Sequence, residues 1–124
     1  MEDFTTITSR ELLNLFKKAK EANSKQIDEI LQFRCNKSPS VGDFIEFAKQ
    51  VLEAKFGITH AKTFDMKGVF EELRNNVGVL VIRSVTFPKT IQHLELAWKM
   101  LWKTAIASAD KFEIENGWIH WWWD

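Results

Sequence analysis

The feature that most constrains the fold is a change to a two-residue period around Asn116-Gly117. Segments 111–115 and 118–123 flank this dipeptide. Asn-Gly between two such segments predicts a β-hairpin, because both residues tolerate the positive φ angles of a type I′ turn. The two-residue loop fixes the register, and the expected opposing pairs are Glu115 with Trp118, Ile114 with Ile119, Glu113 with His120, Phe112 with Trp121 and Lys111 with Trp122.

This register gives the hairpin two unlike faces. One face is apolar enough to lie on helices as core, and it holds Phe112, Ile114, Ile119, Trp121 and Trp123. The other face mixes charged and aromatic groups, and it holds Lys111, Glu113, Glu115, Trp118, His120 and Trp122. Tryptophan supplies a large rigid contact area and an N–H donor, and it is enriched among interface hot spots. We therefore expect Trp118, His120 and Trp122 to bind a partner, with Glu113 and Glu115 giving charge complementarity.

All six tryptophans lie between residues 98 and 123, and the chain has no tyrosine. Two other uses of these aromatic groups stay open at this point. Trp118 and Trp122 can be packed within the molecule or against a second copy in a homodimer. Alternatively, an aromatic pocket between the hairpin and a helix that carries Trp98 and Trp102 can sequester a small ligand.

Apolar residues upstream recur at helical spacing in several segments. Thr8 and Glu11 fit a capping box at the start of a helix that we expect to run to about Ala22. A second, shorter helix is expected over residues 24–34. The N-terminal part of the chain is therefore predicted to be helical.

The next helix is the clearest of the set, with Ser40 as its cap. We expect it to end at Gly57, because glycine readily adopts the left-handed conformation of a C-terminal cap. Further helices are predicted over 65–74 and 90–107, and the β-branched segment 77–82 between them is predicted to be a strand. The fold class that follows is α+β, with about five helices and a small antiparallel sheet that includes the C-terminal hairpin.

Composition bounds the class of protein. The length of 124 residues predicts one domain over 1–124, and 45% apolar and 27% charged residues are typical of a globular protein. Lys plus Arg and Asp plus Glu both number 17, so the formal net charge is zero. No apolar run reaches the roughly 20 residues of a membrane-spanning helix, so we expect no membrane partner. The single cysteine and the absence of a secretory signal predict a cytoplasmic location.

The sequence offers little catalytic or metal-binding chemistry. His60, His93 and His120 lack the close spacing of common zinc ligands, so we expect neither a metal nor another cofactor. Cys35 has no histidine nearby in the sequence to activate it, and Glu113 opposite His120 is only a weak indication of acid–base catalysis. We therefore expect a protein that is not an enzyme.

Binding of nucleic acid is a weaker alternative. A cluster of lysines on the first helix and just after it could contact phosphates: Lys17, Lys18, Lys20 and Lys25. A neutral domain, however, forgoes most of the electrostatic term that drives such binding. The glycines are isolated and form no phosphate-binding loop.

The expectation that fits these observations best is a small intracellular binding protein. We expect a stoichiometric inhibitor or adaptor, of the toxin-immunity or phage counter-defence type, which acts on a protein partner through the Trp-rich hairpin.

Overall fold

The computed structural model describes residues 4–22, 27–34, 37–59, 81–102 and 109–123. The elements in chain order are β1 (Phe4–Thr8), α1 (Ser9–Ala22), α2 (Ile27–Gln32), α3 (Val41–Gln50), β2 (Lys55–Thr59), β3 (Val81–Pro88), α5 (Ile91–Ala97), the π-helical segment η1 (Trp98–Trp102), β4 (Lys111–Glu115) and β5 (Trp118–Trp122). The predicted α+β class is confirmed. The described residues form four α-helices against about five expected, and the helix predicted over 65–74 lies outside the described residues.

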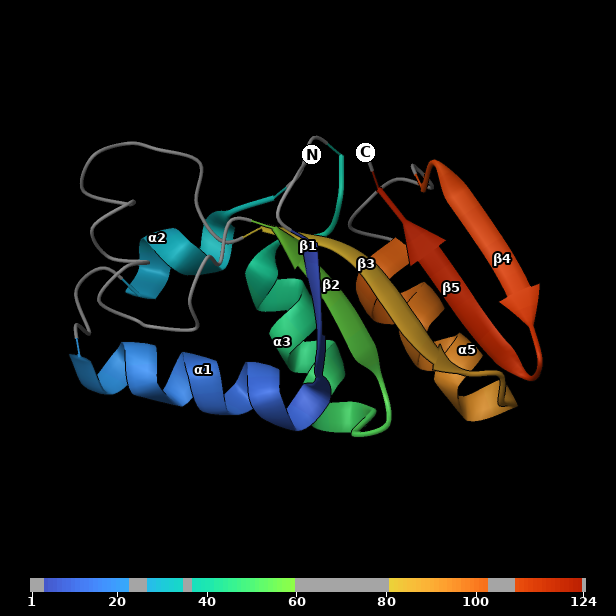
Figure 1. Ribbon diagram of the computed structural model, residues 1–124, viewed down its shortest axis with the longest axis horizontal. Helices are drawn as coiled ribbons and strands as arrows, with labels where there is room; N and C mark the ends of the chain where they lie inside the picture. The colour runs from blue at the N-terminus through green and yellow to red at the C-terminus, as the bar shows by residue number, and fades with distance from the viewer. Residues whose placement is uncertain (1–3, 23–26, 35–36, 60–80, 103–108, 124) are drawn as a thin grey trace.

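The strands form one antiparallel sheet in the order β1-β2-β3-β5-β4. Figure 1 shows α3 and α5 behind this sheet, with α1 running from the lower end of β1 to the left, beyond the sheet. The viewer therefore faces the side of the sheet that these helices leave open. We call the helix-facing side the inner face and the opposite side the outer face.

A run of edge-to-face aromatic contacts holds the helix layer on the inner face. Consecutive ring centroids lie 5.4–6.1 Å apart and are steeply inclined, in the order Phe47, Phe87, Trp121, Trp123, Phe44 and Phe56. All six residues are buried. We call this series the aromatic chain. Because Phe44 and Phe47 belong to α3 and the other four belong to or follow strands, the aromatic chain fixes α3 against β2, β3 and β5.

The N-terminal segment contains a strand that the sequence did not reveal. Phe4–Thr8 pairs with β2 as an edge strand, and α1 begins at the next residue without a loop. The predicted capping box is present, because the backbone N–H of Glu11 donates to Thr8 Oγ1 at 3.2 Å. The predicted end of this helix at Ala22 is also confirmed, whereas α2 is shorter than expected.

The predicted end of the third helix at Gly57 is wrong. Ser40 caps α3 and forms a capping box with Asp43, but the helix ends at Gln50 and residues 55–59 form β2. Gly57 lies inside this strand, opposite Thr6 and Ser84, with a β-bulge beside it. Helical and strand spacing cannot be distinguished over so short an apolar segment, and the sheet contacts decide between them.

The bounds of β3 and α5 differ from those predicted for the strand over 77–82 and the helix over 90–107. β3 continues to Pro88, well beyond the expected end at Ile82, and residues 77–80 lie outside the described residues. Thr90 caps α5 by accepting a hydrogen bond from the N–H of His93 at 3.0 Å. The helix changes to a π-helix at Trp98, and residues 103–107 of the expected helix lie outside the described part.

The predicted hairpin and its register are confirmed at all five pairs. Asn116 and Gly117 have φ angles of 49° and 80°, as a type I′ turn requires. On the apolar face, Ile119, Trp121 and Trp123 are buried as expected. Phe112 and Ile114 are not core, because they are 50% and 51% exposed. They lie on β4, the edge strand of the sheet.

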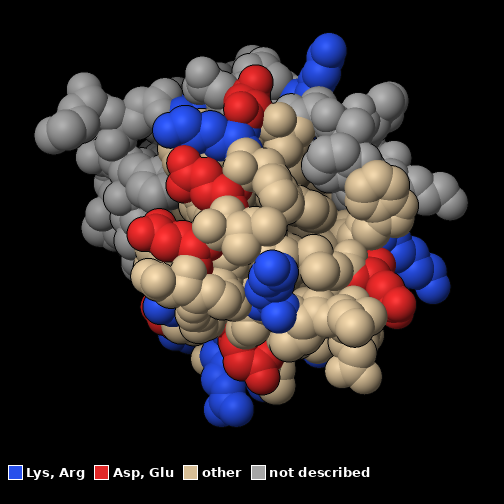
Figure 2. Space-filling view, turned by 90° about the vertical axis from the view of Figure 1, so that its right-hand side faces the viewer, with Lys and Arg blue, Asp and Glu red and all other residues tan. Residues whose placement is uncertain are grey.

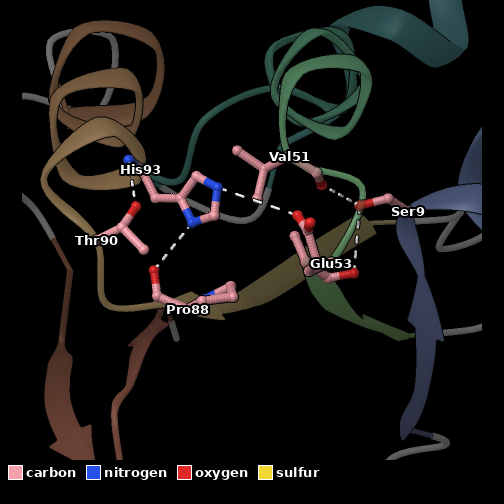
Figure 3. A network of polar contacts seen from close by, with 7 residues as sticks. Ser9, Val51, Glu53, Pro88, Thr90 and His93 are labelled. Carbon is pink, nitrogen blue, oxygen red and sulfur yellow. Dashed lines mark hydrogen bonds and ion pairs between the residues drawn. The ribbon is translucent and has the colours of Figure 1, made fainter.

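A buried hydroxyl ties the start of α1 to the segment between α3 and β2 (Figure 3). Ser9 Oγ donates to the carbonyl of Val51 at 2.6 Å, and the Ser9 N–H donates to the carbonyl of Ala54 at 3.0 Å. On the other side of this segment, Glu53 Oε2 lies 4.0 Å from Nε2 of His93, whose Nδ1 donates to the carbonyl of Pro88 at 3.1 Å. The hydrogen bonds of Ser9 join residues more than 40 positions apart in sequence.

We expect Ser9→Ala to lower the free energy of unfolding by about 1–2 kcal/mol, because it removes the donor from a buried carbonyl. Urea denaturation measures this change. Asn14→Ala on the exposed side of α1 serves as the control and should change stability by less than about 0.5 kcal/mol. Equal effects of the two substitutions would contradict this role of Ser9.

We expect Gly117→Ala to cost about 1 kcal/mol of stability through its positive φ angle alone. A Cβ atom at this position would meet nothing within 4 Å, so no steric clash contributes. Asn116→Gly is the matched control, and thermal or urea denaturation should find it neutral. A loss of several kcal/mol for Gly117→Ala would show that the turn has a different conformation.

Candidate functional site

Side chains of four strands meet on the outer face of the sheet. The pairing places Lys55, Thr86, His120 and Glu113 in one row across β2, β3, β5 and β4. Trp118 and Trp122 lie in the rows on either side, because residues i and i+2 of a strand share a face. The row and its two tryptophans form the centre of the candidate site, which we call the hairpin platform.

Two open hollows lie beside His120 on the hairpin platform. One, of about 480 Å³, is lined by Asp110, Lys111, Glu113, His120 and Trp122. The other, of about 550 Å³, is lined by Lys55, Thr86, Glu113, Glu115, Asn116, Trp118 and His120. Glu113 and His120 contribute to both hollows, so they form the ridge between them.

Polar contacts hold the central histidine in place. His120 Nδ1 lies 2.6 Å from Thr86 Oγ1, within hydrogen-bond distance, and both side chains are half-buried. This contact fixes the rotation of the imidazole ring and leaves its other edge directed away from Thr86. His120 is therefore a preorganised polar group between two aromatic side chains.

Charges of both signs surround the tryptophans. Lys55 Nζ lies 5.7 Å from the ring centroid of Trp118, in cation–π geometry, and Lys111 Nζ lies 3.9 Å from Glu113 Oε1. At an exposed site the cation–π contact contributes about 0.5–1 kcal/mol and also restrains the orientation of the indole. The resulting surface has an aromatic centre and a charged border.

The structure brings the five predicted contact residues together on one face. Trp118 is 37% exposed, His120 and Trp122 are half-buried, and Glu113 and Glu115 are exposed. The two residues predicted to line a ligand pocket are not part of this platform. Trp98 is 61% exposed in η1, which belongs to the helix layer, and the side chain of Trp102 lies outside the described part of the structure.

Sequence reasoning missed Lys55 and Thr86. Lys55 was assigned to the end of a helix, and Thr86 followed the predicted end of a strand. The alternation of polar and apolar residues over 84–87 is the signal that could have extended this strand. No local pattern could have indicated that β2 and β3 lie beside the hairpin.

Comparison with family models, curated proteins and solved structures gives no match for this chain. In the part of the chain that the structure describes, no three His, Cys, Asp or Glu side chains are grouped as a metal site would require. No helix within the described ranges has the length and apolar character to cross a membrane.

The two kinds of hairpin tryptophan should differ in their effect on stability. Trp121 is 3% exposed and belongs to the aromatic chain, so we expect Trp121→Ala to lower the free energy of unfolding by about 3–5 kcal/mol. Trp118→Ala should cost only about 1 kcal/mol, because more than a third of that side chain already contacts solvent. Urea denaturation of both variants makes the comparison, and a larger loss for Trp118→Ala would place that side chain in the core.

Proposed function

We propose that this protein is a small non-enzymatic binding protein that holds a protein partner on its hairpin platform. The observation that carries this proposal is that Trp118, His120 and Trp122 lie in line on the outer face of the sheet, where they line two open hollows. A preorganised aromatic group with a polar border resembles the anatomy of protein interfaces, where Trp is enriched at the centre.

The charge distribution favours a protein over a nucleic acid. The lining of the two hollows contains Lys55 and Lys111 together with Asp110, Glu113 and Glu115. Two basic and three acidic groups offer complementarity to a mixed surface, whereas a polyphosphate backbone would meet repulsion from the carboxylates. We expect the carboxylates to guide a partner surface that carries basic side chains.

The biological role that we propose is that of a stoichiometric inhibitor or adaptor in the cytoplasm, of the toxin-immunity or phage counter-defence type. A single domain of 124 residues with a fixed aromatic surface can block a target by occupying it, with no turnover. The two hollows also support a second candidate, sequestration of a small ligand against Trp118 or Trp122.

The test is affinity capture from lysate of the native host, or of cells that compete with or infect it, compared among wild type, Trp118→Ala and Trp122→Ala. We expect a protein retained by wild type at a fixed ratio and lost from both variants, since truncation of a central tryptophan costs about 2 kcal/mol or more of binding free energy. Mass spectrometry identifies the protein, and calorimetry with the purified pair measures affinity and stoichiometry.

Trp98→Ala is the matched control, because it removes the same side chain from an exposed position in the helix layer. Its capture pattern should equal that of wild type. If Trp98→Ala loses the partner and folded Trp118→Ala and Trp122→Ala retain it, the platform is not the binding surface. Binding that requires RNA or DNA and that weakens steeply as the salt concentration rises would indicate a nucleic-acid partner instead.

A further inference from the structure

We propose that the free edge of β4 pairs with β4 of a second copy of this chain, which gives a two-fold dimer with one continuous ten-stranded sheet. This surface adjoins the hairpin platform and shares Glu113 with it, but its hydrogen bonds come from the backbone edge of the sheet. In the described residues, β4 lies at the end of the sheet and pairs with β5 alone.

The hydrogen bonds of β5 determine which backbone groups of β4 point outward. The N–H of Trp123 donates to the carbonyl of Arg83, and the N–H of Lys89 donates to the carbonyl of Gly117. Odd-numbered residues of this strand are therefore directed at β3, and Trp118, His120 and Trp122 are directed at β4. Their partners in the register are Glu115, Glu113 and Lys111.

It follows that Phe112 and Ile114 direct their N–H and C=O groups away from β5, toward the free edge. Both side chains are half exposed on the inner face, and Phe112 packs against Trp121 at a centroid distance of 6.0 Å. The outward groups end at Asp110, whose N–H turns to the carbonyl of Trp122. The edge thus offers two donors, two acceptors and two apolar side chains.

The order of residues in β4 is self-complementary in an antiparallel pair. When Glu113 lies on the two-fold axis, Phe112 faces Ile114 of the second copy and Lys111 faces Glu115 of the second copy. The two Phe112–Ile114 pairs are then hydrogen-bonded pairs, so four backbone bonds form. Two apolar pairs and two opposite-charge pairs form with them, and cross-strand pairs of both kinds are stabilising.

The same register explains why the pairing closes at two copies. A two-fold axis uses the whole edge of each copy and leaves no further β4 edge for a third. The one unfavourable pair is Glu113 with itself, and each copy has its own Lys111 within 3.9 Å of that carboxylate. Figure 2 shows this side of the molecule, where acidic and basic groups are interspersed with uncharged residues and one basic group stands near the middle.

Sedimentation equilibrium from about 10 µM to about 1 mM tests the proposal. We expect the mass of wild type to rise from 14.5 kDa toward twice that value.

Lys111→Glu and Glu115→Lys should each raise the dissociation constant about tenfold or more, because each puts like charges opposite one another. An equimolar mixture of these two variants should dimerise again, since both cross-strand pairs then have opposite charges. Glu113→Gln should tighten the dimer.

Ile114→Pro tests the outward edge of β4 without disturbing the hairpin. It removes an N–H that points outward and keeps the pairing with β5, so it should abolish the dimer while the thermal unfolding transition stays cooperative. Ile114→Thr keeps the N–H and is the matched control, with a weaker effect on association. A wild type that stays monomeric, a dimer that survives Ile114→Pro, or a failure of the variant mixture to recover association would overturn the proposal.

A dimer lost in Trp118→Ala and kept in Ile114→Pro would also overturn it, and would assign self-association to the hairpin platform. Capture of another protein by the platform is measured with different substitutions. Failure of the edge proposal and failure of the proposed function are therefore distinguishable.

Discussion

The edge-to-face contact between Phe87 and Trp121 is the interaction on which the remaining architecture depends. It joins β3 to β5 within the aromatic chain, and Phe47 of α3 packs on the same Phe87 ring. The other side-chain contacts of the hairpin with the rest of the protein include the Trp123–Phe44 ring contact and the contact between His120 and Thr86. Each such aromatic pair contributes about 0.5–1.5 kcal/mol beyond the area it buries. Consecutive pairs of the aromatic chain have one ring in common. The hairpin is therefore held by side chains from α3, β2 and β3 together.

Burial of Trp121 also decides what the hairpin presents to solvent. Because strand side chains alternate, a strand that buries Ile119, Trp121 and Trp123 must direct Trp118, His120 and Trp122 outward. A slip by one residue would exchange the two sets and put His120 in the core. The proposed binding surface thus needs no separate stabilisation, since the aromatic chain and the turn fix its register. In the two proposals, the outer face of the hairpin binds a partner protein and the backbone edge of β4 pairs with a second copy.

Sequence reasoning succeeded where the signal is local. The register at Asn116-Gly117 depends on two φ angles, and the predicted caps at Thr8 and Ser40 each depend on side chains within three residues. It failed for β1 and β2, because Phe4–Thr8 and Lys55–Thr59 are strands only through their pairing with each other and with β3. The same cause hid Lys55 and Thr86 from the predicted site, while its five hairpin members could be placed on one face in advance.

The strand order has a consequence for the way the chain acquires its structure. β5 is the last strand in sequence, yet it lies between β3 and β4, so β3 has an unpaired edge until the hairpin docks. During synthesis, Val85 and Phe87 emerge more than 30 residues before Trp121 and Ile119, which lie beside them on β5. A nascent chain at that stage exposes a strand edge beside an apolar surface, which is the combination that chaperones recognise and that drives intermolecular association. The hairpin is therefore the element that pairs with the open edge of β3 and completes the five-stranded sheet.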